Sequence, residues 1–263
     1  MKDVCSVRGR GAWLRILLSN DDGIKAEGLE ALIRVFSSRH DVVVSAPMTQ
    51  QSGMSHALTV RKSMEVSRDL SLEQQYGIEA WCVDGTPTDC VKLYLEALAA
   101  EKPDVVISGI NHGANLATDI LYSGTVGGAM EGFLHDISSF AVSLDVKSQL
   151  TYDDTARVFL DYVEKTLCMT EMPIFYNVNF PKAFREGNPT FVFGRQGKRD
   201  YLNAFQREER SDGRIFYSVA GEIFDTDKSE PTDIYAVEAG YVAVTPLMTD
   251  MTNYMMLEKH LEG

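Results

Sequence analysis

Short runs of consecutive apolar residues recur along the chain, and most are followed by a stretch with helical spacing. The apolar runs occupy residues 15–19, 42–45, 104–108 and 140–144. Polar and apolar residues do not alternate within them, which is typical of strands buried on both faces. The helical patterns occupy residues 28–37, 88–100 and 127–135. Buried strands interleaved with helices predict an α/β fold with a mostly parallel sheet and helices on both faces.

The C-terminal part of the chain has a different character. Charged and aromatic residues mix through residues 206–217, and a Ser-Asp-Gly sequence at 211–213 stands between two strand-like stretches. Glycine tolerates the positive φ of a tight turn, so this segment predicts an extended β-hairpin. A strand at 241–247 and a helix at 253–261 are expected to follow. The hairpin and the terminal helix have no obvious core of their own, so they are either an arm that packs on a partner subunit or a solvated edge hairpin.

These patterns divide the chain into three segments. Residues 1–12 have no periodicity and are interpreted as a loose N-terminal extension. Residues 13–190 are expected to form the α/β core. Residues 191–263 are expected to supply the hairpin arm, the final core strand and the terminal helix.

The charge balance and the apolar pattern limit the class of protein. The chain has 25 Lys and Arg against 38 Asp and Glu, a net charge of −13. Binding to duplex DNA depends on a basic face, so we expect no duplex nucleic acid as a partner. No apolar run approaches the roughly 20 residues of a membrane span, and the first residues do not resemble a signal peptide. We therefore expect a cytoplasmic protein without a membrane segment.

The cysteines are scattered along the chain at Cys5, Cys82, Cys90 and Cys168. Because no two of them form a CxxC pair, the spacing argues against a disulfide framework and against a zinc site. It predicts four buried thiols in a reducing compartment. Two of the histidines, His40 and His260, are expected on the surface.

Candidate ligand-binding residues follow the predicted strands, because ligands of open parallel sheets bind beyond the carboxyl ends of the strands. Polar, glycine-rich segments stand at these places: Asn20-Asp21-Asp22-Gly23, Gln51-Ser52-Gly53, Asn111-His112-Gly113-Ala114-Asn115 and Ser123-Gly124-Thr125. The first three follow strands, and the fourth begins a helix. We expect all four segments to converge on one rim of the sheet.

The adjacent carboxylates of Asp21 and Asp22 are the strongest candidates for chemistry. Two like charges this close repel each other unless a cation or a proton lies between them. A hard divalent cation suits the pair, and Ser52 and Asn111 could complete its shell with neutral oxygens. The alternative is that Asn-Asp-Asp-Gly is simply a turn, which its residues suit well.

Ser123, Gly124 and Thr125 at a helix start suit an oxyanion, because free backbone N–H groups point outward there. The alternative is an ordinary helix N-cap. His112 is the one histidine on a candidate site loop, so it is a candidate acid; it could equally be a solvated loop residue. The chain has no P-loop and no GxGxxG after its first strand, and Gly53-Met54-Ser55-His56-Ala57 lacks the final glycine of a nucleophile elbow.

Several longer motifs occur together in a fixed order. They read RILLSNDDG (15–23), QSG (51–53), GTPTDCV (85–91), SGINHGAN (108–115), YSGTV (122–126), YNVNFP (176–181) and GYVAVTPL (240–247). This ordered set resembles the SurE family of stationary-phase survival proteins. The resemblance extends from Leu14 to about Thr252.

The resemblance implies a fold, an activity and an assembly. It implies a Rossmann-like α/β catalytic core and a metal-dependent 5'-nucleotidase that hydrolyses nucleoside 5'-monophosphates to nucleoside and phosphate. Parts of the family also act on polyphosphate. It further implies a homodimer or homotetramer formed by exchange of the C-terminal arm.

The resemblance also implies roles for individual residues. Asp21 and Asp22 would be catalytic, and one divalent cation per subunit, Mg²⁺ or Mn²⁺, would be held by Asp21, Asp22, Ser52 and Asn111. The substrate phosphate would be bound by Asn20, Gly53, Asn115, Ser123, Gly124 and Thr125. The chain departs from the family at Met48, where many members have an acidic residue, and at His112, where arginine is frequent. Residues 1–12 lie outside the family pattern.

The chemistry leaves alternatives open. The cation could bind a phosphate oxygen and lower the pKa of a bound water, or Asp21 could attack phosphorus directly. A phosphatase of the haloacid dehalogenase type would need two aspartates one residue apart, whereas these are adjacent. A module that senses nucleotides without turnover would keep the phosphate loop but would not need two carboxylates.

Overall fold

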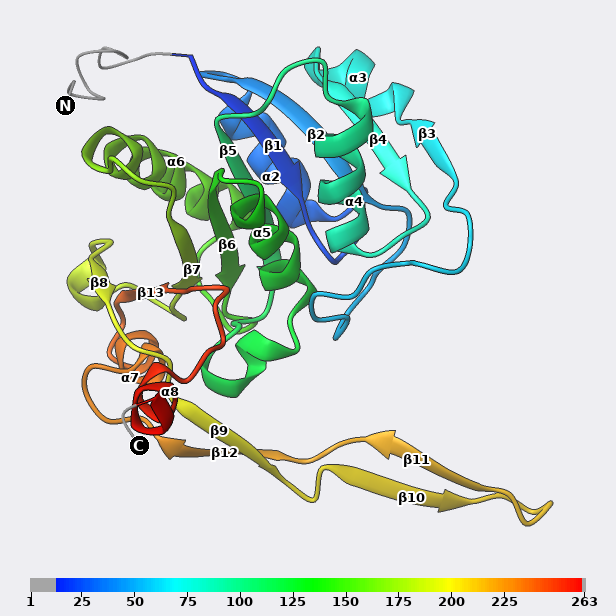
Figure 1. Cartoon of the computed structure of the whole chain (residues 1–263), viewed down its shortest axis with the longest axis vertical. Helices are drawn as coiled ribbons and strands as arrows, with labels where there is room; N and C mark the ends of the chain where they lie inside the picture. The colour runs from blue at the N-terminus through cyan, green and yellow to red at the C-terminus, as the bar shows by residue number, and fades with distance from the viewer. Residues whose placement is uncertain (1–12, 262–263) are drawn as a thin grey trace.

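The chain forms the α/β fold that its apolar runs predict, and the computed structural model describes residues 13–261. The main sheet has nine strands: β1 (Arg15–Ser19), β2 (Asp41–Pro47), β3 (Val66–Arg68), β4 (Glu79–Val83), β5 (Val105–His112), β6 (Ser138–Leu144), β7 (Phe175–Phe180), β8 (Phe191–Phe193) and β13 (Val242–Pro246). Their spatial order is β3-β4-β2-β1-β5-β6-β7-β13-β8 (Figure 1). From β4 to β7 neighbouring strands run parallel, whereas β3 and β13 pair antiparallel with β4 and β7. The mostly parallel sheet is therefore confirmed.

Helices cover both faces of this sheet. The α-helices are α2 (Glu27–Phe36), α3 (Leu70–Tyr76), α4 (Pro87–Leu93), α5 (Gly124–Leu134), α6 (Tyr152–Met169) and α7 (Asp233–Glu238), followed by the exposed α8 (Tyr254–Leu261). Ile16 and Leu18 of β1 pack in one core with Leu32 of α2 and Phe159 of α6. Leu17, between them, points the other way and packs with Val91 of α4. Consecutive residues of β1 are thus buried on opposite faces, which explains why the apolar run shows no alternation.

Two predicted helices differ in extent from the structure. The pattern at 88–100 is α4 followed by a π-helical turn over Tyr94–Leu98. α5 begins at Gly124 rather than at residue 127. Ser123 caps it, because its Oγ accepts a hydrogen bond from the Val126 N–H at 3.1 Å. Glycines weaken the helical pattern at this end, so the early start is hard to recognise in the sequence.

The C-terminal part adds an arm to the body. It contains β9 (Lys198–Leu202), β10 (Phe205–Glu209), β11 (Ile215–Val219) and β12 (Glu222–Asp227). β9 pairs with β12 and β10 with β11, both antiparallel, in a long ribbon that projects from the sheet (Figure 1). The predicted hairpin and terminal helix α8 are confirmed, and every residue of α8 is exposed. β8 and β13 follow residue 190, and both join the main sheet. The chain on either side of this residue thus contributes to one sheet, and the division into segments there stays a prediction.

Some sequence expectations are corrected by the structure. His40 is 4% exposed rather than on the surface, because α6 covers the turn between α2 and β2 and brings Glu164 Oε1 within 2.9 Å of His40 Nε2. The prediction of buried thiols is wrong for Cys168, which is exposed, and for Cys82, which is half-buried; Cys90 is buried. Cys5 and the expected loose extension at 1–12 lie outside the described residues. Within residues 13–261, no helix is long and apolar enough to cross a membrane.

Candidate functional site

Two neighbouring carboxylates stand at the carboxyl end of β1, between β2 and β5. Asp21 is 5% exposed and Asp22 is half-buried. The buried Asn20 closes a tight turn, in which its Nδ2 donates to the Gly23 carbonyl at 2.9 Å and its Oδ1 accepts from the Gly23 N–H at 3.2 Å. The turn that was the alternative interpretation of this sequence is therefore present, and it carries both carboxylates.

The segments after β2 and β5 both contact this turn. The Gln51 N–H donates to the main-chain carbonyl of Asp21 at 2.7 Å, and Gln50 Nε2 donates to Asp22 Oδ1 at 3.3 Å. From the other side, the backbone N–H of His112 donates to Asp22 Oδ2 at 3.1 Å. Because β2, β1 and β5 are parallel neighbours, their carboxyl ends meet at one edge.

The N-terminal end of α5 reaches the same carboxylates. Thr125 Oγ1 donates a hydrogen bond to Asp21 Oδ1. A Cβ atom at Gly124 would lie 2.9 Å from Asp21 Cβ and 3.1 Å from Asp21 Oδ2, so only glycine allows this approach. Ser123 is nearly buried, and its Oγ is used to cap the helix. The rim expected from the sequence is thus formed by three strand ends and one helix start.

The carboxyl group of Asp21 has an unusual environment. Its pKa is raised to about 6, chiefly because burial disfavours the charged form; the hydrogen bond from Thr125 lowers the pKa, and the negative charge of Asp22 raises it. A buried carboxylate next to a second one favours a bound proton or cation. Asp21 is therefore poised to bind a positive charge at neutral pH.

The neutral oxygens near this pair suit a hard cation. Asn111 Nδ2 donates to the Gly113 carbonyl at 2.7 Å, which leaves Asn111 Oδ1 to accept or ligate. Ser52 is exposed and directly follows Gln51. In the part of the chain that the structure describes, no three His, Cys, Asp or Glu side chains gather as a metal site, so a cation would rest on two carboxylates and neutral oxygens. This donor set fits Mg²⁺ or Mn²⁺.

Asn115 lies farther along the loop after β5. Its N–H donates to Asn179 Oδ1 at 2.8 Å, and its carbonyl accepts from Asn177 Nδ2 at 2.8 Å and from Asn179 Nδ2 at 3.0 Å. Its own Nδ2 donates to Ser143 Oγ at 3.0 Å. The loop is therefore tied to the ends of β6 and β7. Gly53 is solvent-exposed.

His112 stands at the exposed rim of the site. Its Nδ1 lies 2.9 Å from the hydroxyl of Tyr152 at the start of α6. This contact orients the imidazole beside Asp22, whose carboxylate the His112 backbone holds.

Comparison with known proteins decides the family. A sequence model described as "Survival protein SurE" matches residues 16–203. The chain belongs to the SurE family. A protein from Heliobacterium modesticaldum named 5'-nucleotidase SurE is 43% identical over 247 residues, which cover 94% of this chain and 90% of that protein. Another with the same name, from Pelotomaculum thermopropionicum, is 40% identical over 248 residues, which cover 94% of this chain and 93% of that protein.

A solved structure supports the same assignment. The crystal structure of the SurE protein from Aquifex aeolicus superposes with a TM-score of 0.78 at 39% sequence identity. The match covers 95% of this chain and all of that one. The Rossmann-like core and the C-terminal arm thus belong to a SurE fold.

Several residues at this SurE site had no role in the sequence reasoning. Gln50 contacts Asp22, and the fully buried Asn177 and Asn179 hold the loop that carries Asn115. The sequence feature that could have identified Asn177 and Asn179 is the presence of two amide side chains at alternate positions of an otherwise apolar strand. Both then point to one face, and they need partners there because buried amides are costly unless they are hydrogen-bonded.

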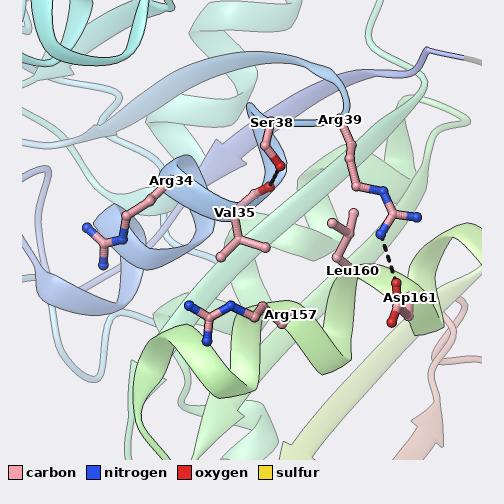
Figure 2. A pocket seen from close by; sticks show the side chains of 7 residues that line it. All are labelled: Arg34, Val35, Ser38, Arg39, Arg157, Leu160 and Asp161. Atoms are coloured by element: carbon pink, nitrogen blue, oxygen red, sulfur yellow. Dashed lines mark hydrogen bonds and ion pairs between the residues drawn. The ribbon is translucent and has the colours of Figure 1, made fainter.

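A surface hollow of about 430 Å³ lies elsewhere on this SurE chain, on the outside of α2 and α6 (Figure 2). It is lined by Arg34, Val35, Ser38, Arg39, Arg157, Leu160 and Asp161. Each arginine already has a carboxylate partner: Asp153 at 2.6 Å for Arg34, Asp161 at 2.9 Å for Arg39 and Asp154 at 3.1 Å for Arg157. Because these charges are neutralised locally, the hollow does not compete as a phosphate site.

Proposed function

We propose that this chain is a 5'-nucleotidase that hydrolyses nucleoside 5'-monophosphates to nucleoside and phosphate with one divalent cation per subunit, Mg²⁺ or Mn²⁺. The observation that carries the proposal is the pair of adjacent carboxylates: the buried Asp21 accepts a hydrogen bond from the start of α5, and Asp22 accepts hydrogen bonds from the two strand-end loops. The names of the curated relatives support the substrate class.

The proposal assigns a role to each candidate residue. The cation would be held by Asp21, Asp22, Ser52 and Asn111. The phosphate would be bound by Asn20, Gly53, Asn115, Ser123, Gly124 and Thr125. When bound, a divalent cation neutralises charge on phosphate oxygens and makes water more acidic.

The chain's own groups would prepare the reaction. Thr125 fixes one oxygen of the Asp21 carboxylate, and the backbone N–H of His112 fixes one oxygen of Asp22. A phosphate bound at the N-terminal end of α5 would lie at the positive end of the helix dipole, which stabilises negative charge. Asp21 serves either as a ligand or as the attacking nucleophile, and His112 is the candidate acid for the leaving nucleoside oxygen.

The test is phosphate release from a panel of nucleoside 5'-monophosphates, with inorganic polyphosphate as a separate arm. The protein is stripped with EDTA and then assayed with Mg²⁺ or Mn²⁺ restored, beside Asp21→Asn. We expect release that depends on the cation and is lost in the variant. Release that persists in EDTA, or near wild-type turnover in Asp21→Asn, would contradict the proposal.

We further propose that two chains exchange their C-terminal arms in a homodimer, which could pair into a homotetramer. The support is the apolar surface left uncovered in one chain: Phe205 is 66% exposed, Tyr217 64% and Val219 86%. Such surface is rare in a monomer and marks an interface. Light scattering at micromolar concentration tests this, and a monomer would contradict it.

A further inference from the structure

The loop after β2 is fastened to α5, and to the turn that precedes α5, at several points beyond the site residues. The Ser55 N–H donates to the Tyr122 carbonyl at 3.0 Å, and Ser55 Oγ donates to the Leu121 carbonyl at 2.7 Å. Ser55 has a φ of +54°, a left-handed conformation that is uncommon for a residue other than glycine. These hydrogen bonds hold the loop in that conformation. Ser52 and Gly53 lie in the same loop, three and two residues earlier, respectively.

α5 touches the loop directly at Gly127. A Cβ atom at this position would lie 2.2 Å from the Ser55 carbonyl oxygen, which is closer than any real contact. The loop backbone therefore packs against the helix backbone itself. Any side chain at Gly127 would push the loop away from the helix.

Glu131 makes the third contact, one turn farther along α5. It is 3% exposed, and its Oε2 lies 2.7 Å from His56 Nε2 in the loop. Its Oε1 lies 3.2 Å from Lys92 Nζ and 3.3 Å from His135 Nε2. A buried carboxylate costs free energy unless such partners neutralise it, so the Glu131 carboxylate depends on these contacts.

These contacts lie on one face of α5. Gly124, Gly127 and Glu131 are spaced three and four residues apart, which places them on the same side of a helix. Gly124 meets Asp21, Gly127 meets Ser55, and Glu131 meets His56. One rigid helix face thus sets the distance between the buried carboxylate and the loop that carries Ser52.

We propose that Glu131 is a positioning residue: through His56 it holds the loop of residues 51–57 against α5 and so places Ser52 and Gly53 beside Asp21. The proposal rests on the function proposed above, because Ser52 and Gly53 are assigned there to the cation and the phosphate. Glu131 acts only through His56 and does not itself contact the reacting groups.

The chain offers a matched control for this proposal. His56 and His135 both contact Glu131, but only His56 lies in the loop, whereas His135 ends α5. The variants are His56→Ala, His135→Ala, and His56→Gln, whose side-chain amide can still donate to Glu131. Gly127→Ala perturbs the same loop from the helix side.

The measurements are the Kd for Mn²⁺, KM and kcat for a nucleoside monophosphate, and amide hydrogen exchange over residues 51–57. For His56→Ala we expect the Kd and KM to rise about tenfold, the size typical of lost outer-shell support, with kcat changed less. The rate of amide hydrogen exchange in residues 51–57 should rise as well. His135→Ala should stay close to wild type in all of these, His56→Gln should recover most of the loss, and Gly127→Ala should resemble His56→Ala.

Two outcomes would overturn the positioning role. One is equal behaviour of His56→Ala and His135→Ala, which would make Glu131 a purely structural carboxylate. The other is unchanged loop exchange in His56→Ala. If the proposed function failed instead, wild type itself would release no phosphate. Amide hydrogen exchange and Mn²⁺ binding would still decide whether His56 and Glu131 hold the loop.

Discussion

The hydroxyl of Thr125 donates a hydrogen bond to the carboxylate of Asp21, although Thr125 lies in the first turn of α5 and Asp21 in the turn that follows β1. The contact joins the helix that would receive phosphate to the carboxylate that would receive the cation. It therefore couples the orientation of Asp21 to the placement of α5.

Replacing Thr125 by valine keeps the shape of the side chain but removes this hydrogen bond. A hydrogen bond to a charged group contributes about 1.5–3 kcal/mol, so we expect Thr125→Val to lower kcat/KM by about tenfold or more. Thr125→Ser keeps the hydroxyl and should retain most of the activity. Steady-state kinetics with Mn²⁺ checks this, and a fully active Thr125→Val would show that Asp21 needs no such support.

Asp21 should destabilise the metal-free protein at neutral pH. Its folded pKa, about 6, is raised above the ordinary value of about 3.9, so the folded state binds this proton more tightly than the unfolded state does. The contribution of Asp21 to the free energy of unfolding is therefore largest below about pH 4, and it is lost as the pH rises through about 6.

Asp21→Asn removes this penalty while keeping the size of the side chain. In EDTA at pH 7 we expect the variant to unfold at a higher temperature than wild type. Its free energy of unfolding should be higher by up to about 3 kcal/mol, and this difference should shrink toward pH 4. Asp200→Asn, at an exposed position of the arm, is the control and should change little. Calorimetry in EDTA measures this, and a less stable Asp21→Asn at pH 7 would contradict the assignment.

Gly124→Ala should damage the site more than the fold. The added methyl group would lie 2.9 Å from Asp21 Cβ, so the carboxylate or the helix must move. Alanine also favours the helix by up to about 1 kcal/mol, which offsets part of the loss of stability. We expect at least tenfold weaker Mn²⁺ binding by titration calorimetry with nearly unchanged far-UV circular dichroism. Wild-type metal affinity would mean that Asp21 is free to shift without loss.

Arg199 should anchor the arm to the body. Its side chain is 10% exposed and lies 2.9 Å from Asp119 and 2.7 Å from Asp225. Removing one partner of a buried ion pair costs about 3–5 kcal/mol, so Arg199→Ala should lower the free energy of unfolding by this order. Arg207→Ala breaks an exposed pair with Glu209 and should cost less than about 1 kcal/mol. Equal effects in chemical denaturation would contradict the anchoring role.

Much of this protein was predictable because the relevant properties are local. Ile16, Leu17 and Leu18 form an unbroken apolar run, and hydrophobic periodicity alone places such a run in a buried strand. Asp21 and Asp22 follow that strand directly, so the general geometry of parallel sheets predicts that they stand at the ligand-binding edge. The assignment of helices to both faces follows from the same patterns.

Other features depended on contacts between distant segments, and no local pattern encodes them. His40 looks like a polar turn residue in the sequence, and only the packing of α6 over that turn buries it against Glu164. The pairing of Glu131 with His56, 75 positions apart, arises because the loop after β2 crosses α5.

The sequence by itself therefore determined the central strands β1, β2, β5 and β6, the helices α2, α4, α5 and α8, and the carboxylates of Asp21 and Asp22, because burial and periodicity act over a few neighbouring residues. The tertiary structure decided which polar groups meet. The raised pKa of Asp21 depends on the burial of its carboxyl group in the folded chain, and its hydrogen bond from Thr125 exists only once α5 is docked. Such interactions depend on distance in space, which the order of residues along the chain does not specify.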